Sequence, residues 1–501
     1  MSRVRFDLDT PIPDLTQIRA VHILAIGGAG MSAVARLFLD AGIPVSGSDS
    51  QDSATLADLA ARGARVFVGH DAAHLGQADT VVVSSAIRLD NVELVAARQS
   101  GRRILHRAHA LACLSAGRRV VAIAGASGKT STTSMLTDAL RHAGADPTFA
   151  IGGDLADLGV NAARGAGPDA AIEADESDGS FLVYRPHVAV VTNVQADHLD
   201  FYGTFAGVQA AYAAFAETIH PDGTLVTCLD DAGARQLAAA HRARGGRVIS
   251  YGVQPGAQFR LEGIELAGLH SRCRLVSADA AVGPSAPGGG GAESTGVELV
   301  IPAPGEYNLA NAAGAYLAAT QGLGYPPEPI LAGLAEYAGV RRRFEIRGEV
   351  AGVRVVDDYA HNPAKVAAVI STAVRLAAPG RLIAVFQPHL YSRTRDFAAD
   401  FAAALAPAQQ VVVLDVYAAR EEPIPGVSGE LITATLAQHS PAAVHYVPGL
   451  AAAAQRVVQL AQPGDLVVTI GAGDVTDVAG LVLSGLAGQA GTKGGMTCGS
   501  V

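Results

Sequence analysis

The feature that most constrains the fold of this sequence is a short apolar run that leads directly into a glycine-rich turn. Residues 120–124 read VVAIA, which is typical of a buried strand, and residues 125–131 (GASGKTS) precede a segment of helical character. A buried strand, a tight turn and a helix in this order form the repeating unit of α/β proteins with a mainly parallel sheet. We therefore expect an α/β fold.

The turn has the residue types of a loop that binds phosphate. Its backbone N–H groups and the N-terminus of the following helix can face phosphate oxygens. Lys129 would neutralise charge on the β- and γ-phosphates, and the hydroxyl group of Thr130 would bind Mg²⁺. The long form of this motif has a further glycine where Ile123 stands, so the alternative is a structural turn with a surface lysine. ATP is the expected nucleotide, with contacts from Gly125, Ala126, Ser127, Gly128, Lys129, Thr130 and Ser131.

Acidic side chains follow a second strand candidate. The stretch AAIEADESD contains Glu173, Asp175, Glu176 and Asp178. A phosphate loop needs a second group to hold its metal ion, and an acid at the end of a neighbouring strand is the usual solution. Glu173 is the expected ligand because it stands at the edge of the strand, with Glu176 as the second choice. The alternative is a solvated turn.

A third strand candidate, residues 188–192, leads to another polar group. Asp197, His198 and Asp200 follow it within a few residues. Active sites in α/β proteins converge at the carboxyl ends of the strands. We therefore expect His198 to contribute to the same site, with a purely structural histidine as the alternative.

The length of 501 residues predicts about three folding units, because a single hydrophobic core rarely serves so long a chain. Strand-like and helix-like patterns alternate through residues 1–117, 118–338 and 339–484. Residues 277–296 are small and aperiodic, so they are expected to form a flexible insertion in the second unit. The glycine-rich residues 485–501 are expected to be a disordered tail.

Composition excludes several classes of protein. The formal net charge is -10 and the basic residues are scattered, so a nucleic acid is not an expected partner. The four cysteines are far apart, without the spacing of a zinc site or of a small disulfide framework. No apolar run approaches the roughly 20 residues that cross a bilayer, and the N-terminal residues do not resemble a signal peptide. These features predict a cytoplasmic protein with no membrane insertion.

A second glycine pattern lies near the N-terminus. Gly28, Gly30 and Ala33 follow the apolar run HILAI, and Asp49 ends the next strand candidate. This pattern usually indicates a dinucleotide site, so a nicotinamide oxidoreductase is one alternative. That alternative leaves the GKT turn and the acidic strand ends unexplained. A second alternative is that these glycines serve only helix packing.

Longer strings match a known family in their order along the chain. They are GASGKTST, EADESDGSF, VVTNVQADHLDFYG, GVRRRFE, DDYAHNP, FQPHLYSRT and DVYAAREEPIPGVSGE. These strings resemble the Mur ligase family, and the resemblance covers residues 20–480. It implies an N-terminal Rossmann-like domain that binds UDP, a central ATPase-like α/β domain with the phosphate loop, and a C-terminal Rossmann-like domain that binds an amino acid.

The resemblance is closest to the branch of the family that adds L-alanine. Other branches carry a lysine soon after the DHLD segment, whereas here no lysine stands between His198 and Asp222. The implied reaction uses ATP to phosphorylate the carboxylate of UDP-N-acetylmuramic acid. L-alanine then attacks the acyl phosphate, giving an amide, ADP and phosphate in peptidoglycan precursor synthesis. A monomer or a homodimer is expected.

The family pattern implies a role for individual residues. The expected UDP-sugar contacts are Gly28, Ala29, Gly30, Met31, Asp49, Ser84, Ser85, Ala86 and Ile87. Beyond the phosphate loop, the expected ATP contacts are Asn308, Asn311, Arg343, Asp358 and His361. Thr130, Glu173 and His198 are the expected Mg²⁺ ligands, and Tyr359, His389 and Arg393 are expected near the amino acid. The expected catalytic residues are Lys129, Glu173, His198 and Arg343.

The chain departs from the family pattern at several positions. Ala126 and Ser127 replace Thr-His in the phosphate loop. Glu306 and Tyr307 stand where Arg-His is usual, and Leu390 replaces an arginine. Two further hypotheses follow from these changes. One is a related ligase that uses another amino acid or a peptide, and the other is a catalytically weakened homologue that binds the UDP-sugar.

Overall fold

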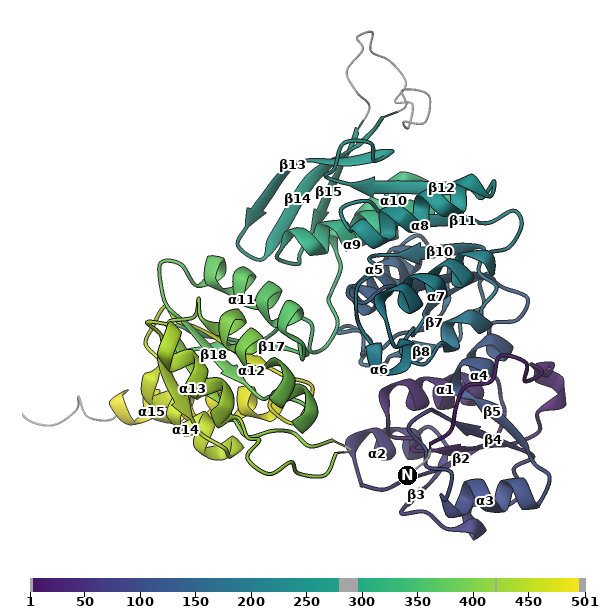
Figure 1. Ribbon diagram of the computed structural model, residues 1–501, viewed down its shortest axis with the longest axis horizontal. Helices are drawn as coiled ribbons and strands as arrows, with labels where there is room; N and C mark the ends of the chain where they lie inside the picture. Colours follow the sequence, from purple (N-terminus) through teal and green to yellow (C-terminus); the bar gives the residue numbers. More distant parts are fainter. Residues whose placement is uncertain (1–2, 279–295, 420, 495–501) are drawn as a thin grey trace, which may run out of the picture. The chain divides into compact units, whose positions relative to one another are not determined.

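The computed structural model describes residues 3–278, 296–419 and 421–494. These residues divide into two compact units, Met1–Val340 and Arg341–Val501. Within the described residues the strands form three sheets, two in the first unit and one in the second. The expected three-part α/β architecture is confirmed (Figure 1).

The N-terminal sheet of the first unit is parallel and has the strand order β3-β2-β1-β4-β5. Its strands are β1 (Val21–Leu24), β2 (Val45–Asp49), β3 (Arg65–Val68), β4 (Thr80–Val83) and β5 (Arg103–His106). Its helices are α1 (Ala29–Asp40), α2 (Ala54–Ala61), α3 (Val92–Gln99) and α4 (Arg107–Leu114). Strands β1 and β4 are fully buried because helices cover both faces of the sheet.

The order of these strands locates a candidate binding edge. Strand β1 pairs with β2 on one side and with β4 on the other, so the chain reverses its direction of winding at β1. Ligands of open α/β sheets bind at this switch point, beyond the carboxyl ends of the strands. Gly28 lies there, as the N-cap residue of α1.

The central sheet of the first unit has the order β15-β14-β13-β12-β11-β10-β6-β9-β7-β8. Its parallel part contains β6 (Arg119–Ala124), β7 (Thr148–Ala150), β9 (Asp169–Glu173), β10 (Val188–Val191), β11 (Thr224–Cys228) and β12 (Val248–Gly252). At one end, β13 (Phe259–Ala267), β14 (His270–Ser277) and β15 (Gly296–Ile301) form antiparallel pairs that our sequence reading did not identify. At the other end, β8 (Ala162–Ala163) pairs antiparallel with β7.

Helices cover both faces of the central sheet (Figure 1). They are α5 (Lys129–His142), α6 (Leu199–Tyr202), α7 (Phe205–Glu217), α8 (Ala232–Ala243), α9 (Glu306–Leu317) and α10 (Pro327–Ala335). Successive residues of β6 alternate between two cores: Val121 and Ile123 pack on the α5 and α9 side, and Ala122 packs on the side of α7 and α8. The second of these cores also includes residues of α1 and α4, so the N-terminal and central sheets share one apolar interior.

The second unit contains a sheet of order β16-β17-β21-β18-β19-β20. Its strands are β16 (Glu345–Val350), β17 (Val353–Asp358), β18 (Leu382–Phe386), β19 (Gln410–Val413), β20 (Ala443–Tyr446) and β21 (Leu466–Ile470). Helices α11 (Pro363–Ala377), α12 (Tyr391–Leu405) and α13 (Glu430–His439) cover one face, and α14 (Leu450–Leu460) and α15 (Thr476–Gly494) cover the other. Only β16 is antiparallel among these described strands.

The two irregular segments expected from composition have different outcomes. Residues 279–295, most of the expected insertion, and residues 495–501 lie outside the described residues. Residues 485–494 are helical and continue α15, which corrects the expectation of disorder there. Leu486 is buried in the core of the second unit, and this burial offsets the weak helix preference of the neighbouring glycines. Among the described residues, no helix is both long and apolar enough to span a membrane.

Candidate active site

The phosphate loop joins β6 to α5 in a conformation that requires glycine at two positions. Gly125 and Gly128 have φ angles of +141° and +88°. A Cβ atom on Gly125 would overlap the hydroxyl group of Thr192, and one on Gly128 would lie 2.5 Å from Oδ1 of Asn311. Helix α5 begins at Lys129, directly after Gly128, so its first N–H groups open onto this turn. The local structure is therefore that of an anion-binding loop.

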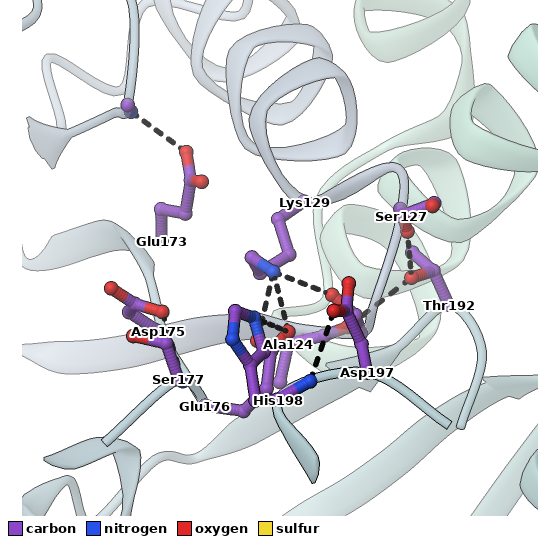
Figure 2. Close-up of polar contacts among 12 residues, drawn as sticks. Ala124, Ser127, Lys129, Glu173, Asp175, Glu176, Ser177, Thr192, Asp197 and His198 are labelled. Carbon is purple, nitrogen blue, oxygen red and sulfur yellow. Dashed lines mark hydrogen bonds and ion pairs between the residues drawn. The ribbon is translucent and has the colours of Figure 1, made fainter. Parts of the chain in front are cut away.

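Residues directly after the neighbouring strand β10 hold the loop in place. The hydroxyl group of Thr192 donates to the Ser127 carbonyl oxygen at 2.6 Å, as Figure 2 shows. The side chain of Asn193 accepts from the Ser127 N–H at 3.0 Å and donates to the Ser127 carbonyl at 2.9 Å. Both residues follow β10, and sequence reasoning did not identify either of them as part of the loop. Their position directly after the strand VAVV was the available signal.

Lys129 forms a buried ion pair with the second of the two acids that the sequence analysis considered. Its Nζ donates to Glu176 Oε2 at 2.8 Å and Oε1 at 2.9 Å, and to the Gly125 carbonyl oxygen at 2.7 Å (Figure 2). Burial alone would lower the pKa of Lys129, but the charges of Glu176, Asp175 and Glu173 raise it above its ordinary value. Lys129 therefore stays charged in the low-dielectric interior.

Glu173 faces a different partner, although only three positions separate it from Glu176. Its Oε1 accepts from the Thr130 hydroxyl group at 3.1 Å, and its Oε2 accepts from the Gly152 N–H at 2.7 Å. Figure 2 shows its carboxylate apart from the Lys129–Glu176 pair. The structure thus brings together two of the expected metal ligands, Thr130 and Glu173.

His198 lies on the side of Glu176. Its Nε2 is 3.8 Å from Glu176 Oε1, and its backbone N–H donates to Asp197 Oδ1 at 2.9 Å. His198 has a φ angle of +53° and begins the short helix α6. In the described part of the chain, no group of three or more His, Cys, Asp or Glu side chains is arranged as a metal site by itself.

The two expected adenine-side asparagines lie on one turn of α9. Asn308 Nδ2 donates to the Pro304 carbonyl oxygen at 2.8 Å, and Asn311 Nδ2 donates to Asn308 Oδ1 at 3.4 Å. Both side chains are buried. Asn311 also borders the phosphate loop through its close approach to Gly128. These contacts place Asn311 directly beside the loop.

The expected UDP-sugar residues surround the N-terminus of α1. The Gly27 N–H donates to Asp49 Oδ2 at 3.0 Å, which fixes the glycine turn against the end of β2. Gly28 is the N-cap residue, and Ala29, Gly30 and Met31 form the first turn of the helix. This helix end presents backbone N–H groups at the switch point of the sheet.

The segment of Ser84, Ser85, Ala86 and Ile87 reaches the acidic turn of the central sheet. The Ser85 hydroxyl group donates to Asp178 Oδ2, and His106 Nε2 lies 3.2 Å from Ser85 Oγ and 3.4 Å from Asp178 Oδ2. Burial raises the pKa of Asp178, but the hydrogen bond and charge of His106 and the hydrogen bonds from Ser180 and Ser85 lower it overall. Ser85 and Asp178 both face the same nitrogen of His106, so the three do not form the relay of a hydrolase.

A cation that the sequence analysis missed stands between these two regions. Arg107 Nη2 donates to Asp175 Oδ2 at 2.9 Å. A Cβ atom on Gly30 would lie 2.7 Å from Arg107 Nη1. Arg107 is the first residue of α4, directly after the carboxyl end of β5, and that position was the signal that could have found it.

The expected residues of the second unit gather at the carboxyl end of β17. The guanidinium groups of Arg342 and Arg343 lie 4.9 Å and 5.1 Å from the centre of the Tyr359 ring. Asp358 accepts from the N–H groups of Phe344 and Ala360, each at 2.8 Å. Burial raises the pKa of Asp358, and the Arg343 charge opposes that rise.

His361 and its neighbours extend this cluster. Arg393 Nη1 donates to the His361 carbonyl oxygen at 3.3 Å, and the His361 and His389 rings lie 6.0 Å apart. Burial, with the charge of Lys365 next, lowers the pKa of His361 to about 3, so its imidazole is neutral at pH 7. The His389 ring stacks on Tyr417 at 5.9 Å, and the sequence analysis did not identify this tyrosine.

Family models match most of the chain in three consecutive parts. The model described as "Mur ligase family, catalytic domain" matches residues 20–119. The "Mur ligase middle domain" matches residues 123–319, and "Mur ligase, glutamate ligase domain" matches residues 342–473.

The chain belongs to the Mur ligase family. This confirms the resemblance drawn from the sequence strings.

Two Mur ligases with high identity to this chain carry the same functional name. The UDP-N-acetylmuramate--L-alanine ligase of Renibacterium salmoninarum is 48% identical over 474 residues, which are 95% of this chain and 97% of that protein. The protein of the same name from Kineococcus radiotolerans is 49% identical over 480 residues, 95% of this chain and 98% of its own length. The similarity therefore spans the N-terminal, central and C-terminal parts together.

Solved structures of Mur ligases share this fold. A UDP-N-acetylmuramate-alanine ligase from Thermotoga maritima aligns with a TM-score of 0.78 at 27% identity, over 94% of this chain and 99% of that one. A murein peptide ligase from Psychrobacter arcticus aligns with a TM-score of 0.67 at 22% identity, over 96% of this chain and 100% of that one, which shows the fold alone. The N-terminal glycine pattern thus belongs to a Mur ligase domain, and the nicotinamide oxidoreductase hypothesis loses its basis.

Proposed function

We propose that this Mur ligase joins the amine of L-alanine to the carboxylate of UDP-N-acetylmuramic acid, with ATP converted to ADP and phosphate, in peptidoglycan precursor synthesis. One observation carries this proposal: near full-length identity of 48–49% to ligases named for this reaction. The intact phosphate loop, with Lys129 charged and in place, supports ATP as the phosphoryl donor. The cytoplasm, which holds ATP and amino acids, is the proposed location.

The proposed chemistry has two steps. A carboxylate oxygen of the sugar nucleotide attacks the γ-phosphorus of ATP, the bond from that phosphorus to the β-γ bridging oxygen breaks, and ADP leaves. The alanine amine then attacks the acyl carbon, loses a proton, and expels phosphate as the amide forms. Because both steps move charge among oxygens, positioning and charge neutralisation account for most of the catalysis that the protein supplies.

Lys129 is proposed to neutralise the migrating phosphoryl group. It lies at the start of α5, where the loop N–H groups and the helix N-terminus also favour an anion. Its ion pair with Glu176 holds Nζ at the mouth of the loop, next to the Gly125 carbonyl group. Glu176 is therefore proposed to position Lys129.

The residues beside the loop fit Mg²⁺. This ion prefers oxygen ligands, retains several waters, and takes one or two protein groups together with substrate phosphates. The Thr130 hydroxyl group and the Glu173 carboxylate are adjacent oxygens of that kind. His198 stands beside Glu176, and we propose that it completes the protein's share of the metal environment. Bound there, Mg²⁺ would supply positive charge to the phosphate oxygens.

The remaining expected residues are proposed to bind the substrates. Arg343, held against Tyr359, is proposed to carry positive charge to the phosphoryl group, and Arg393 is proposed to pair with the carboxylate of the amino acid. Asp358 and His361 are proposed on the nucleotide side, and His389 with Tyr359 near the amino acid. Asn308 and Asn311 are proposed on the adenine side.

The test measures phosphate release from ATP in the presence of Mg²⁺ and UDP-N-acetylmuramic acid. L-alanine, glycine, L-serine and a short peptide are each added separately. The mass of the product is a second readout. Release that requires both the sugar nucleotide and L-alanine is the expected result. Release with another amine identifies a related ligase with a different substrate. Binding of the sugar nucleotide without ATP turnover identifies a weakened homologue. A sedimentation experiment on the same sample tests whether the enzyme is a monomer or a homodimer.

A further inference from the structure

Arg107 combines three properties that the proposed mechanism does not use. It is a cation, it is largely removed from water with a side-chain exposure of 22%, and it borders the first turn of α1. A buried guanidinium group stays charged, so it must face an anion. Asp175 supplies one such anion at 2.9 Å.

The two ends of the guanidinium group face different surroundings. Nη2 donates to Asp175, whereas Nη1 is the atom nearest to a Cβ built on Gly30, at 2.7 Å. The absence of a side chain at position 30 is what lets the guanidinium group lie against this turn. Burial alone would lower the pKa of Arg107, but the charges of Asp175, Asp178 and Tyr184 raise it.

The surroundings of Nη1 favour a second anion. The N-terminus of α1 carries positive partial charge and unsatisfied N–H groups, which attract phosphate oxygens. A planar guanidinium group matches a phosphate through paired N–H donors. The guanidinium group therefore lies against the first turn of α1, beside Gly30.

We propose that Arg107 binds the diphosphate of the sugar nucleotide at the N-terminus of α1, and that Asp175 is the counter-ion of its guanidinium group when no ligand is bound. This inference rests on the proposed function, because that function supplies the sugar nucleotide. It adds Arg107 and Asp175 to the residues expected from the family pattern.

The Arg107–Asp175 pair also admits a purely structural role, since it links the N-terminal sheet to the acidic turn of the central sheet. The two roles give different results when each partner is changed separately. A structural ion pair is lost equally with either residue. A binding arginine is lost only with Arg107, because removal of Asp175 leaves the guanidinium group free to pair with the ligand.

The experiment measures calorimetric affinities for UDP and for uridine, without ATP, in the full chain and in three variants. Arg107→Met keeps the aliphatic stem and removes the charge. Asp175→Asn keeps the shape of the side chain and removes its charge. Arg19→Ala is the matched control, because Arg19 also pairs with an aspartate, Asp79 at 3.0 Å, but stands before β1 at the opposite end of that strand.

The ratio of UDP affinity to uridine affinity isolates the diphosphate, because general damage to the fold weakens both ligands alike. We expect Arg107→Met to lower this ratio by about tenfold or more, the effect of losing charged hydrogen bonds. Arg19→Ala is expected to leave the ratio unchanged. Asp175→Asn is expected to leave it unchanged or to raise it. An unchanged ratio in Arg107→Met, or equal losses in Arg107→Met and Asp175→Asn, overturns the proposal.

Two further measurements keep the result decisive. If Arg107→Met does not fold, Arg107→Lys is measured in its place, because lysine keeps the charge but lacks the paired N–H donors. A several-fold lower ratio of UDP affinity to uridine affinity in Arg107→Lys supports the proposal. An unchanged ratio overturns it. Phosphate release by the unmodified enzyme is measured on the same preparation. Failure of that reaction with intact UDP binding counts against the proposed function alone.

Discussion

The amine of Lys129 lies 2.8 Å and 2.9 Å from the two carboxylate oxygens of Glu176, so the phosphate-loop lysine and the acidic turn after β9 form one buried, mutually neutralising pair. The side-chain exposures of 15% and 3% exclude most water from the pair. Its two members are separated by 47 positions in the sequence. This single contact therefore links catalysis to stability.

Lys129→Ala is expected to lower phosphate release by about 100-fold or more, because a preorganised charge at the phosphoryl group is lost. The same change leaves the Glu176 carboxylate buried without its partner, and we expect the free energy of unfolding to fall by about 3 kcal/mol. The double variant Lys129→Ala/Glu176→Gln is the control. The double variant should recover the free energy of unfolding, measured by chemical denaturation, but not phosphate release. Recovery of both would show that Lys129 acts only on the stability of the fold.

Glu173→Gln is expected to raise the Mg²⁺ concentration needed for half-maximal phosphate release by about tenfold or more, because the carboxylate beside Thr130 loses its charge. Glu176→Gln is the matched variant, since Glu176 pairs with Lys129. Its main effect should fall on the maximal rate. A larger shift in the Mg²⁺ titration for Glu176→Gln than for Glu173→Gln would reverse the proposed roles.

Tyr359→Phe keeps the aromatic face that contacts Arg342 and Arg343, whereas Tyr359→Ala removes it. We expect Tyr359→Ala to lower kcat by about 3- to 10-fold, the amount that a cation–π contact contributes. Tyr359→Phe should retain kcat within about twofold. Equal kcat losses in the two variants would indicate that the hydroxyl group, and not the ring, is the important part.

Glu93 is the buried anion of the N-terminal sheet. It accepts hydrogen bonds from Ser48 Oγ at 2.5 Å, His70 Nδ1 at 2.9 Å and His74 Nδ1 at 3.0 Å, and His22 Nε2 lies at 3.5 Å. Burial raises the pKa of Glu93, but the bonds from His22, Ser48 and His70 and the His22 charge lower it from 4.5 to about 2.

A folded pKa below the unfolded value stabilises the protein above pH 4.5, and this stabilisation is lost as the pH falls toward 2. Between pH 5 and pH 3, the unmodified protein should lose about 2 kcal/mol more unfolding free energy than Glu93→Gln. Denaturant titrations at the two pH values measure the difference. Parallel losses in both proteins would show that Glu93 titrates normally.

Much of the fold could be predicted from local patterns. The strand candidates at residues 120–124 and 188–192 correspond to β6 and β10, because a buried parallel strand appears as a continuous apolar run. The antiparallel strands β13 to β15 were missed, although buried and exposed residues alternate along β13 and β14 as expected for strands with one exposed face. The helical continuation to Gly494 was missed because glycine-rich composition says nothing about packing of Leu486.

The candidate site was predictable to the extent that its members are neighbours in the chain. Residues 125–131 stand between a strand and a helix, and Lys129 and Thr130 follow from that order alone. The residues assigned to the substrates in Sequence analysis remain predictions, and the structure shows only which of them lie together. Arg107 could not be found this way, because its partner Asp175 is 68 positions away.

The sequence by itself determined the α/β class, the family and the phosphate loop, because apolar periodicity, glycine turns and ordered motifs are encoded between adjacent residues. Only the tertiary structure decided that Glu173 faces Thr130, that Glu176 faces Lys129, and that Arg107 lies between Gly30 and Asp175. Asp175 and Glu176 follow the end of β9, so strand alternation no longer sets the direction of their side chains, and Arg107 meets its partner only through the fold. Their partners are then chosen by burial, since each charge removed from water must meet an opposite charge.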